Sequence, residues 1–468
     1  MKVRMQKTIS QVIDCPQKNS TECKGYEGVQ TFIGMTENNL AEVNFTTKNL
    51  MEQIFLPNNL NKAYLKVYSN QGASGVDKME VTELLPYLQT HKDELINSLM
   101  NGTYNPQAVR RVEIPKDNSK KRQLGIPIVI DRVIQQAINQ VLTLIYDPTF
   151  SNSSFGFRPN LSCHYALRKV QKHVNDGYKY AIDLDLEKYF DTINQSKLME
   201  ILSRTIKDGR LLSLIHKYLK SGVIVNNRFE NSDKGVPQGG PLSPLLSNIM
   251  LNELDKELEQ RGCRFVRYAD DCMILCKSKR AANRTKISIV RFIETKLYLK
   301  VNIEKTKVGY IRGLKYLGYS FYVTKGNCRL YLHPKSYIKM KARLKELTSR
   351  NNGMGYAMRK YKLKEYIVGW LGYYRLADMK SILKSTDEWL RRRIRMCIWK
   401  YWKKVKTKFN NLIKCGIAKN QAWQWANTRK GYWRIAGSPV LDRAITNDKM
   451  RIAGYSFLYD YYRKVYRK

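Results

Sequence analysis

The segment Tyr180–Leu186 alternates so regularly that it fixes one element of the fold. Every second residue is Tyr, Ile or Leu, and the positions between them include Asp183 and Asp185. Because side chains point to opposite faces of a strand in turn, this pattern predicts a strand with one apolar and one acidic face. A strand of this kind needs a sheet to cover its apolar side.

A second acidic feature, Asp270-Asp271, follows further along the chain. Residues 264–276 read as two short strands with Ala269, Asp270 and Asp271 at the tip of a hairpin. An Asp-Asp pair alone is usually a turn or a helix cap. If both segments lie in one sheet, however, the pair meets Asp185, and three crowded carboxylates are costly without a cation. Carboxylates are good ligands for Mg²⁺, and phosphoryl displacement uses two such ions about 3.5–4 Å apart.

The charge of the chain predicts a polyanionic partner. There are 83 Lys and Arg against 40 Asp and Glu, which gives a net charge of +43. Residues 331–468 contain 34 Lys and Arg against 8 Asp and Glu, so +26 of this charge lies there, together with all seven Trp. Basic and aromatic residues together are typical of nucleic-acid binding, through phosphate contacts and base stacking.

Several other classes of protein are disfavoured by the sequence. The nine Cys include no CxxC pair and there are only five His, so no zinc pattern is present. The residues 1–45 are polar and lack the apolar core of a secretory signal, and no apolar run has the length of a membrane span. We therefore expect reduced thiols and a cytoplasmic, nucleic-acid-associated protein of bacterial type, without a membrane partner.

Three more segments have clear local patterns. Residues 110–127 predict a basic hairpin with a loop at 117–121. Ser243-Pro244 predicts a helix start, with Ser243 as N-cap and an apolar stripe, and Gly262 is its expected stop. From residue 335 the pattern is helical.

These motifs together resemble the reverse transcriptases encoded by group II introns. The matching segments stand in the family order, from about residue 50 to the C-terminus, and are short: RQLGIP at 122–127, GFRP at 156–159, DLEKYFD at 185–191, GVPQGGPLSP at 235–244, YADD at 268–271, EKTK at 304–307 and YLGY at 316–319. The resemblance implies an α+β right-hand polymerase fold. We expect an extension at 1–45, fingers and palm at 46–330, and a basic helical thumb and maturase region at 331–468.

The resemblance also implies a catalytic site. Asp185, Asp270 and Asp271 would be catalytic and would bind two Mg²⁺ ions, for which Mn²⁺ is a possible substitute, with the carbonyl of Leu186 as a further ligand. In the incoming dNTP site we expect the residues Lys116, Arg122, Phe190, Asp191 and Gln238. Contacts to template, primer or RNA are expected from Arg158, Gly239, Gly240 and Lys305. Several of these residues have a simpler explanation. Lys116 and Arg122 would lie on a solvated basic hairpin, Phe190 would be a core residue, Gly239 and Gly240 would form a turn before the helix, and Lys305 would lie on the solvated surface.

The C-terminal region resembles the family's thumb and maturase part. Arg391, Arg392 and Arg393 lie on a predicted helix with few acids at four-residue spacing, which favours RNA binding over a merely solvated face. For the Trp residues we favour core packing over base stacking, with Trp399 and Trp402 turned inward. The family's Cys- and His-rich endonuclease module is not expected.

The implied function is RNA-directed DNA synthesis combined with maturase activity. The implied partners are a group II intron RNA, an RNA template, a DNA primer, target DNA and dNTPs. Two alternatives remain open: a non-enzymatic RNA-binding splicing cofactor, and a domesticated reverse transcriptase in repair or phage defence. The complete set of acids argues against the first alternative.

Overall fold

The computed structural model describes residues 47–115, 121–226 and 228–466. Contacts divide this chain into two compact units, the first ending at Leu314 and the second beginning at Lys315. None of the helices in these ranges is both long and apolar enough to cross a membrane. Each unit is described by itself below.

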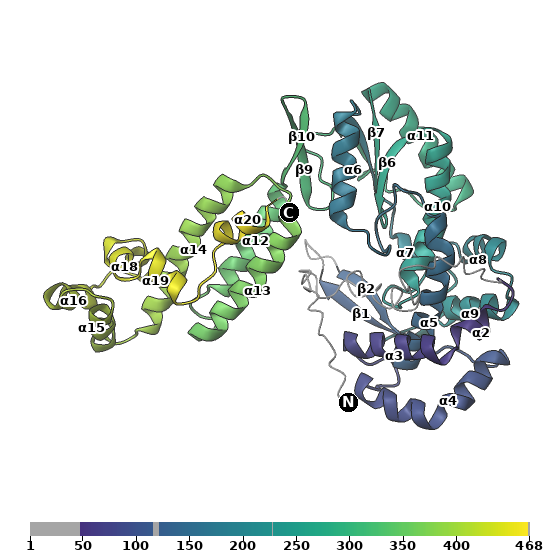
Figure 1. Cartoon of the computed structure of the whole chain (residues 1–468), viewed down its shortest axis with the longest axis horizontal. Helices are drawn as coiled ribbons and strands as arrows, with labels where there is room; N and C mark the ends of the chain where they lie inside the picture. Colours follow the sequence, from purple (N-terminus) through teal and green to yellow (C-terminus); the bar gives the residue numbers. More distant parts are fainter. Residues whose placement is uncertain (1–46, 116–120, 227, 467–468) are drawn as a thin grey trace, which may run out of the picture. The chain divides into compact units, whose positions relative to one another are not determined.

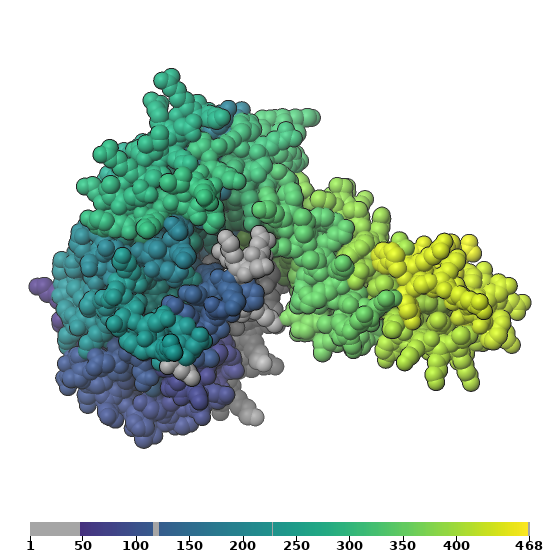
Figure 2. All heavy atoms as spheres, turned by 180° about the vertical axis from the view of Figure 1, so that it is seen from behind, coloured from purple at the N-terminus to yellow at the C-terminus, as the bar shows by residue number. Residues whose placement is uncertain are grey.

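The first unit combines helices with two four-stranded sheets. Its helices are α2 Leu50–Ile54, α3 Pro57–Asn70, α4 Leu84–Met100, α5 Val129–Tyr146, α6 Cys163–Asn175, α7 Tyr189–Thr192, α8 Gln195–Thr205, α9 Gly209–Lys220, α10 Ser243–Gln260 and α11 Lys279–Lys296, with the 3₁₀ helices η1 Val81–Glu83 and η2 Asp147–Thr149. Its strands are β1 Val109–Pro115, β2 Lys121–Ile126, β3 Tyr180–Leu184, β4 Val223–Val225, β5 Arg228–Glu230, β6 Arg264–Tyr268, β7 Asp271–Cys276 and β8 Lys307–Tyr310. The helices α4 and α11 lie at opposite ends of this unit, as Figures 1 and 2 show.

One sheet has the strand order β2-β1-β4-β5 and contains the predicted basic hairpin. The strands β1 and β2 are antiparallel, with Arg110 opposite Ile126 and Pro115 opposite Lys121. The helix α5 follows directly and is buried along nearly its whole length, packed against α3 (Figure 1). The predicted hairpin is therefore confirmed, and a buried helix fixes its base.

The other sheet has the order β6-β7-β3-β8 and confirms both acidic elements. The strand β3 pairs antiparallel with β7, with Leu184 opposite Cys272, and β7 forms a hairpin with β6 in which Tyr268 is opposite Asp271. The helices α6, α10 and α11 pack against this sheet. Ile182 and Leu184 are buried as the alternation predicted.

The helix α10 differs from its prediction at the first residue. Leu242 is the N-cap, so Ser243 and Pro244 occupy the first helical turn. The hydroxyl of Ser243 donates to the carbonyl of Pro237 at 2.6 Å instead of capping the helix. The predicted stop is close, since the helix ends at Gln260 and Gly262 has φ +64°.

The second unit is a β-hairpin followed by helices. Its elements are β9 Tyr319–Thr324, β10 Asn327–Leu332, α12 Pro334–Leu347, α13 Tyr356–Tyr374, α14 Lys380–Tyr401, α15 Val405–Lys414, α16 Lys419–Ala426, α17 Tyr432–Ala436, α18 Pro439–Ala444, α19 Asn447–Ile452 and α20 Leu458–Val465. The hairpin β9–β10 groups with these helices, because Tyr319 packs on Tyr373 and Tyr374 and the amide of Asp378 donates to Leu330. The boundary between the two units therefore lies between Leu314 and Lys315, whereas the sequence predicts it after residue 330.

Candidate active site

Three carboxylates gather at one end of the β6-β7-β3-β8 sheet. Asp185 follows the last residue of β3, and Asp271 is the first residue of β7. Because Leu184 pairs with Cys272, the register brings Asp185 next to Asp271. Asp270 occupies the turn between β6 and β7, directly after Ala269, which has φ +56°. Asp270 and Asp271 are exposed and Asp185 is half-buried, so a substrate can reach all three.

The carboxylate of Asp185 already has a cationic neighbour. Lys305 Nζ lies 3.1 Å from Asp185 Oδ2. The segment that carries Lys305 is held close to β3, since the amide of Asn302 donates to the Asp185 carbonyl at 2.8 Å and the amide of Asp185 donates to Thr306 Oγ1 at 3.3 Å. Lys305, which was selected from the sequence, therefore lies beside the carboxylate of Asp185.

The donor chemistry of this edge fits a hard divalent cation. All three side chains offer oxygen, the donor that Mg²⁺ and Mn²⁺ prefer. Within the described ranges, however, no three His, Cys, Asp or Glu side chains are grouped closely enough to hold a metal ion. The backbone places the acids together, and their side chains would converge by rotation. Leu186, the other predicted ligand, is buried and pairs with Val301 beside them.

Two of the predicted dNTP-binding residues contact each other. Arg122, exposed on β2, donates from Nε to Gln238 Oε1 at 2.9 Å. The amide of Gly125 donates to the Gln238 carbonyl at 2.7 Å, so the loop 235–242 is tied to β2. Lys116 falls outside the described residues.

The same loop is tied to the short helix α7. The amide of Val236 donates to the Phe190 carbonyl at 2.7 Å, and the amide of Gly235 donates to Ile193 at 2.8 Å. Asp191 is exposed beside this contact. The side chain of Phe190 is only 8% exposed and packs edge-on against Tyr189 in the core. Phe190 is thus part of the core of this unit, and its contact with a dNTP stays a prediction.

Packing within the protein explains the glycines of this loop. Gly239 has φ +125°, and a Cβ there would lie 2.3 Å from the carbonyl oxygen of Gly125. A Cβ on Gly240 would lie 2.3 Å from Gln135 Oε1 of α5. Both positions need the absent side chain for close backbone approach. Close packing therefore accounts for both glycines, and their contacts with template or primer stay a prediction.

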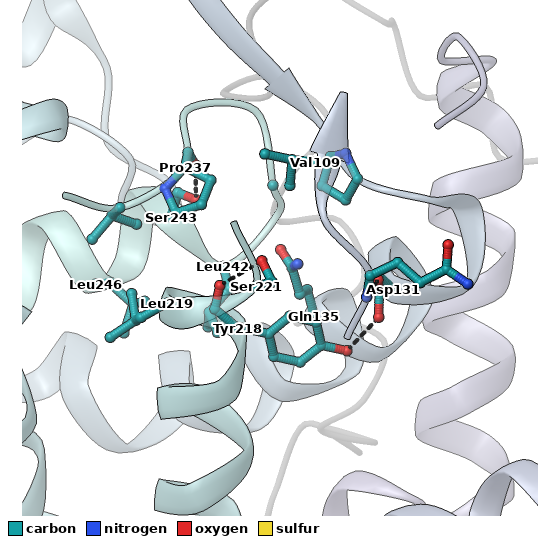
Figure 3. A pocket seen from close by; sticks show the side chains of 14 residues that line it. Val109, Asp131, Gln135, Tyr218, Leu219, Ser221, Pro237, Leu242, Ser243 and Leu246 are labelled. Atoms are coloured by element: carbon teal, nitrogen blue, oxygen red, sulfur yellow. Dashed lines mark hydrogen bonds between the residues drawn. The ribbon is translucent and has the colours of Figure 1, made fainter. Parts of the chain in front are cut away.

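A small cavity with a mainly apolar lining lies behind the loop (Figure 3). It is lined by Asp131 and Gln135 of α5, Tyr218 of α9, and residues between Val236 and Leu246. Asp131 accepts hydrogen bonds from Tyr104 Oη at 2.7 Å and Tyr218 Oη at 3.0 Å, and burial raises its pKa to about 6. Sequence reasoning missed this group; its only signal was one acid within the apolar run that forms α5.

Arg158 is engaged within the fold. Its side chain is 9% exposed and donates to Asp147 Oδ1 at 2.7 Å and to the carbonyls of Ser151 and Ser154. The guanidinium also lies over the ring of Phe150. These donors hold a loop of the protein, and the template contact of Arg158 stays a prediction.

The arginines of α14 are also used internally. Arg392 lies 4.1 Å from the centroid of the Trp433 ring and donates to the Trp433 carbonyl at 2.9 Å. Arg393 donates to Thr348 Oγ1 at 2.6 Å, and Arg391 lies over Phe457. These contacts hold α14 to neighbouring segments of the second unit, and the RNA contacts of the three arginines stay a prediction. The inward packing of Trp399 and Trp402 is confirmed, since both are buried.

Comparisons with known proteins agree with this architecture. Residues 114–321 match the family model "Reverse transcriptase (RNA-dependent DNA polymerase)", and residues 338–416 match "Group II intron, maturase-specific domain". Protein YkfC of Escherichia coli K12 is 34% identical over 315 residues, covering 58% of this chain and 82% of YkfC. Group II intron-encoded protein LtrA of Lactococcus lactis is 41% identical over 210 residues, covering 45% of this chain and 35% of LtrA. A solved structure of telomerase from Candida albicans has a TM-score of 0.43 at 12% identity, over 77% of this chain and 65% of that one.

The matches to the two family models and the sequence similarity to these relatives define a reverse transcriptase, which is an RNA-directed DNA polymerase. Enzymes of this class use divalent metal ions. The chain belongs to the family of reverse transcriptases encoded by group II introns. Proteins of this family carry a maturase-specific domain after the polymerase and bind RNA. The aligned region makes up only about a third of LtrA, so the activities of that whole protein are a matter for proposal.

Proposed function

We propose that this chain adds dNTPs to a primer 3′ end on an RNA template, using two Mg²⁺ ions bound by Asp185, Asp270 and Asp271. Mn²⁺ is a possible substitute. The observation that carries this proposal is that the backbone places the three acids at one sheet edge. Asp185 follows β3, and Asp270 and Asp271 lie at the turn of the β6–β7 hairpin beside it. Bound divalent ions would supply charge stabilisation for phosphoryl transfer.

The protein's own groups would position the reactants. Arg122 suits the triphosphate, because a guanidinium binds phosphate bidentately. Gln238 would orient the Arg122 side chain through the hydrogen bond between the two residues. Lys305 is an exposed cation beside Asp185 and would balance negative charge there. Asp191 lies next to the loop 235–242 and is a candidate second contact in the dNTP site.

The second unit would bind the intron RNA as a maturase, assist its splicing, and support copying of the intron into target DNA. The charge of +26 on residues 331–468 supports this, because counterion release drives binding to a polyanion. The match to the maturase-specific domain supports the choice of RNA.

Primer extension on an RNA template with dNTPs and Mg²⁺ tests the polymerase. The variant Asp270→Asn removes a metal-binding charge at nearly constant size and should abolish synthesis while RNA binding persists. Asp176→Asn, the same change at an exposed residue after α6, is the matched control and should be fully active. Wild-type protein that binds RNA but makes no DNA would instead favour a splicing cofactor.

A further inference from the structure

A buried ion pair lies beneath the turn that carries Asp270. Arg267 of β6 and Asp255 of α10 both have side chains that are 0% exposed. Arg267 Nε donates to Asp255 Oδ1 at 2.8 Å and Nη2 donates to Asp255 Oδ2 at 2.5 Å, a bidentate arrangement. Such a pair is costly to desolvate, and apolar residues of similar volume often stabilise a fold as well or better.

The remaining nitrogen of Arg267 connects the pair to the turn. Nη1 donates to the carbonyl of Ala269 at 3.0 Å and to Asn248 Oδ1 at 2.9 Å. Ala269 is the left-handed residue directly before Asp270, a conformation that is uncommon for a residue with a side chain. The guanidinium therefore holds the backbone at the point where the chain turns toward the acids.

Asn248 extends the same network to a second loop. Its Nδ2 donates to the carbonyl of Gly156 at 2.8 Å. Gly156 in turn lies against the turn, since a Cβ there would be 2.3 Å from the amide nitrogen of Ala269. The turn is thus held from below by α10 and from one side by Gly156.

The pairing of β6 does not need this side chain. The amide of Arg267 donates to the carbonyl of Ser153 at 2.8 Å, its carbonyl accepts from Phe155 at 2.9 Å, and β6 pairs with β7 along its length. The strand would keep its place without the guanidinium, whereas the Ala269 carbonyl would lose its side-chain donor.

We propose that Arg267, Asp255 and Asn248 are positioning residues that fix the turn bearing Asp270 and Asp271, so that the two carboxylates converge with Asp185 on a divalent cation. This inference rests on the proposed polymerase function. The three residues contact neither substrate nor metal and act through the Ala269 backbone.

The test replaces the ion pair without leaving a lone buried charge. The double variant Arg267→Met with Asp255→Leu removes both charges at similar volume, so the protein should still fold. Mn²⁺ affinity, measured by electron paramagnetic resonance without dNTP or primer, should fall about 10–100-fold. The value of kcat should fall by a similar factor, while KM for primer–template stays close to that of the wild type.

Two further variants separate geometry from charge and from folding. Arg267→Lys keeps the charge but not the forked donors, so it should not restore Mn²⁺ affinity. Asn248→Ala leaves the ion pair intact, and this single substitution should weaken Mn²⁺ binding. If the double variant does not fold, the Mn²⁺ affinity of Asn248→Ala tests the proposal instead. The same double change at the exposed pair, Arg210→Met with Glu52→Leu, is the control.

Wild-type Mn²⁺ affinity and kcat in a folded double variant would overturn the proposal, as would wild-type Mn²⁺ affinity in Asn248→Ala when the double variant is unfolded. Failure of the polymerase function itself has a different signature, because the wild-type protein would then make no DNA.

Discussion

Replacing Gly239 by alanine should disturb both stability and dNTP use, because the position has no room for a side chain. The backbone at φ +125° is in a region that strains other residues by about 1–3 kcal/mol. The new Cβ would be 2.3 Å from the Gly125 carbonyl oxygen, a backbone atom that cannot rotate away, and overpacking of this kind costs about 1–3 kcal/mol more. Together the two effects amount to about 2–6 kcal/mol.

The structure indicates how this strain would be relieved. The loop would move off β2, which stretches the hydrogen bond between Gly125 and the Gln238 carbonyl and separates Gln238 from Arg122. We expect Gly239→Ala to lower the unfolding midpoint of the first unit by at least about 4 °C. We also expect a KM for dNTP that is higher by about tenfold or more, which corresponds to about 1.4 kcal/mol of lost binding.

The matched control is Gly209→Ala in the same unit. Gly209 begins α9, has no atom within 4 Å of a Cβ, and should gain about 0.4–1 kcal/mol from the substitution. Calorimetry and steady-state kinetics with varied dNTP measure both effects. If Gly239→Ala matches the wild type in unfolding midpoint and in dNTP KM, the reasoning from close backbone approach is wrong.

Other substitutions have outcomes that follow from single features. Burial raises the pKa of Asp131 to about 6, so between about pH 4 and 6 the folded state holds a proton that the unfolded state has lost. The free energy of unfolding should therefore fall as pH rises from about 4 to 6. Asp131→Asn should remove this pH dependence in chemical unfolding of the first unit. Asp387 in α14 also has a pKa raised to about 6, by burial, so Asp387→Asn should flatten the same pH window for the second unit. Gly372→Ala, in open space within α13, should stabilise the second unit by about 0.5–1 kcal/mol in thermal unfolding. Arg122→Ala should raise the dNTP KM without changing RNA affinity, and an unchanged KM would exclude Arg122 from the triphosphate site.

The elements that carry the acids could be predicted because their signals are local. The alternation of residues 180–186 specifies a strand, and the short strands around Ala269 specify a hairpin, without knowledge of any distant residue. What the sequence could not supply is the register of β3 against β7, which sets Asp185 beside Asp271. Register depends on the packing of both strands against α11, and of their neighbour β6 against α6 and α10, so it is a property of the whole unit.

The support of the catalytic turn was missed for the same reason. Arg267 looks like an ordinary exposed residue of a short strand, and Asp255 looks like a polar position of a helix. Their pairing appears only when β6 lies on α10, and the contact of Asn248 with Gly156 joins residues 92 positions apart. Burial of charge is decided by tertiary structure, and nothing in the local pattern marks it.

The arginines of the second unit show that net charge alone does not predict which basic side chains are available to bind RNA. A sequence gives the sum of positive charge, but an arginine has five donors and a flat surface that suit internal contacts as well as phosphate. Arg393 and Arg392 are used in this way, and Arg395 donates to the Ile445 carbonyl at 2.9 Å. Lysine has three donors on one compact ammonium group and remains at the surface more readily, as the exposed Lys404 and Lys406 illustrate. The excess charge should therefore act on RNA mainly through such lysines, whereas arginines of α14 also make contacts within the unit, with Trp433, Thr348 and Ile445.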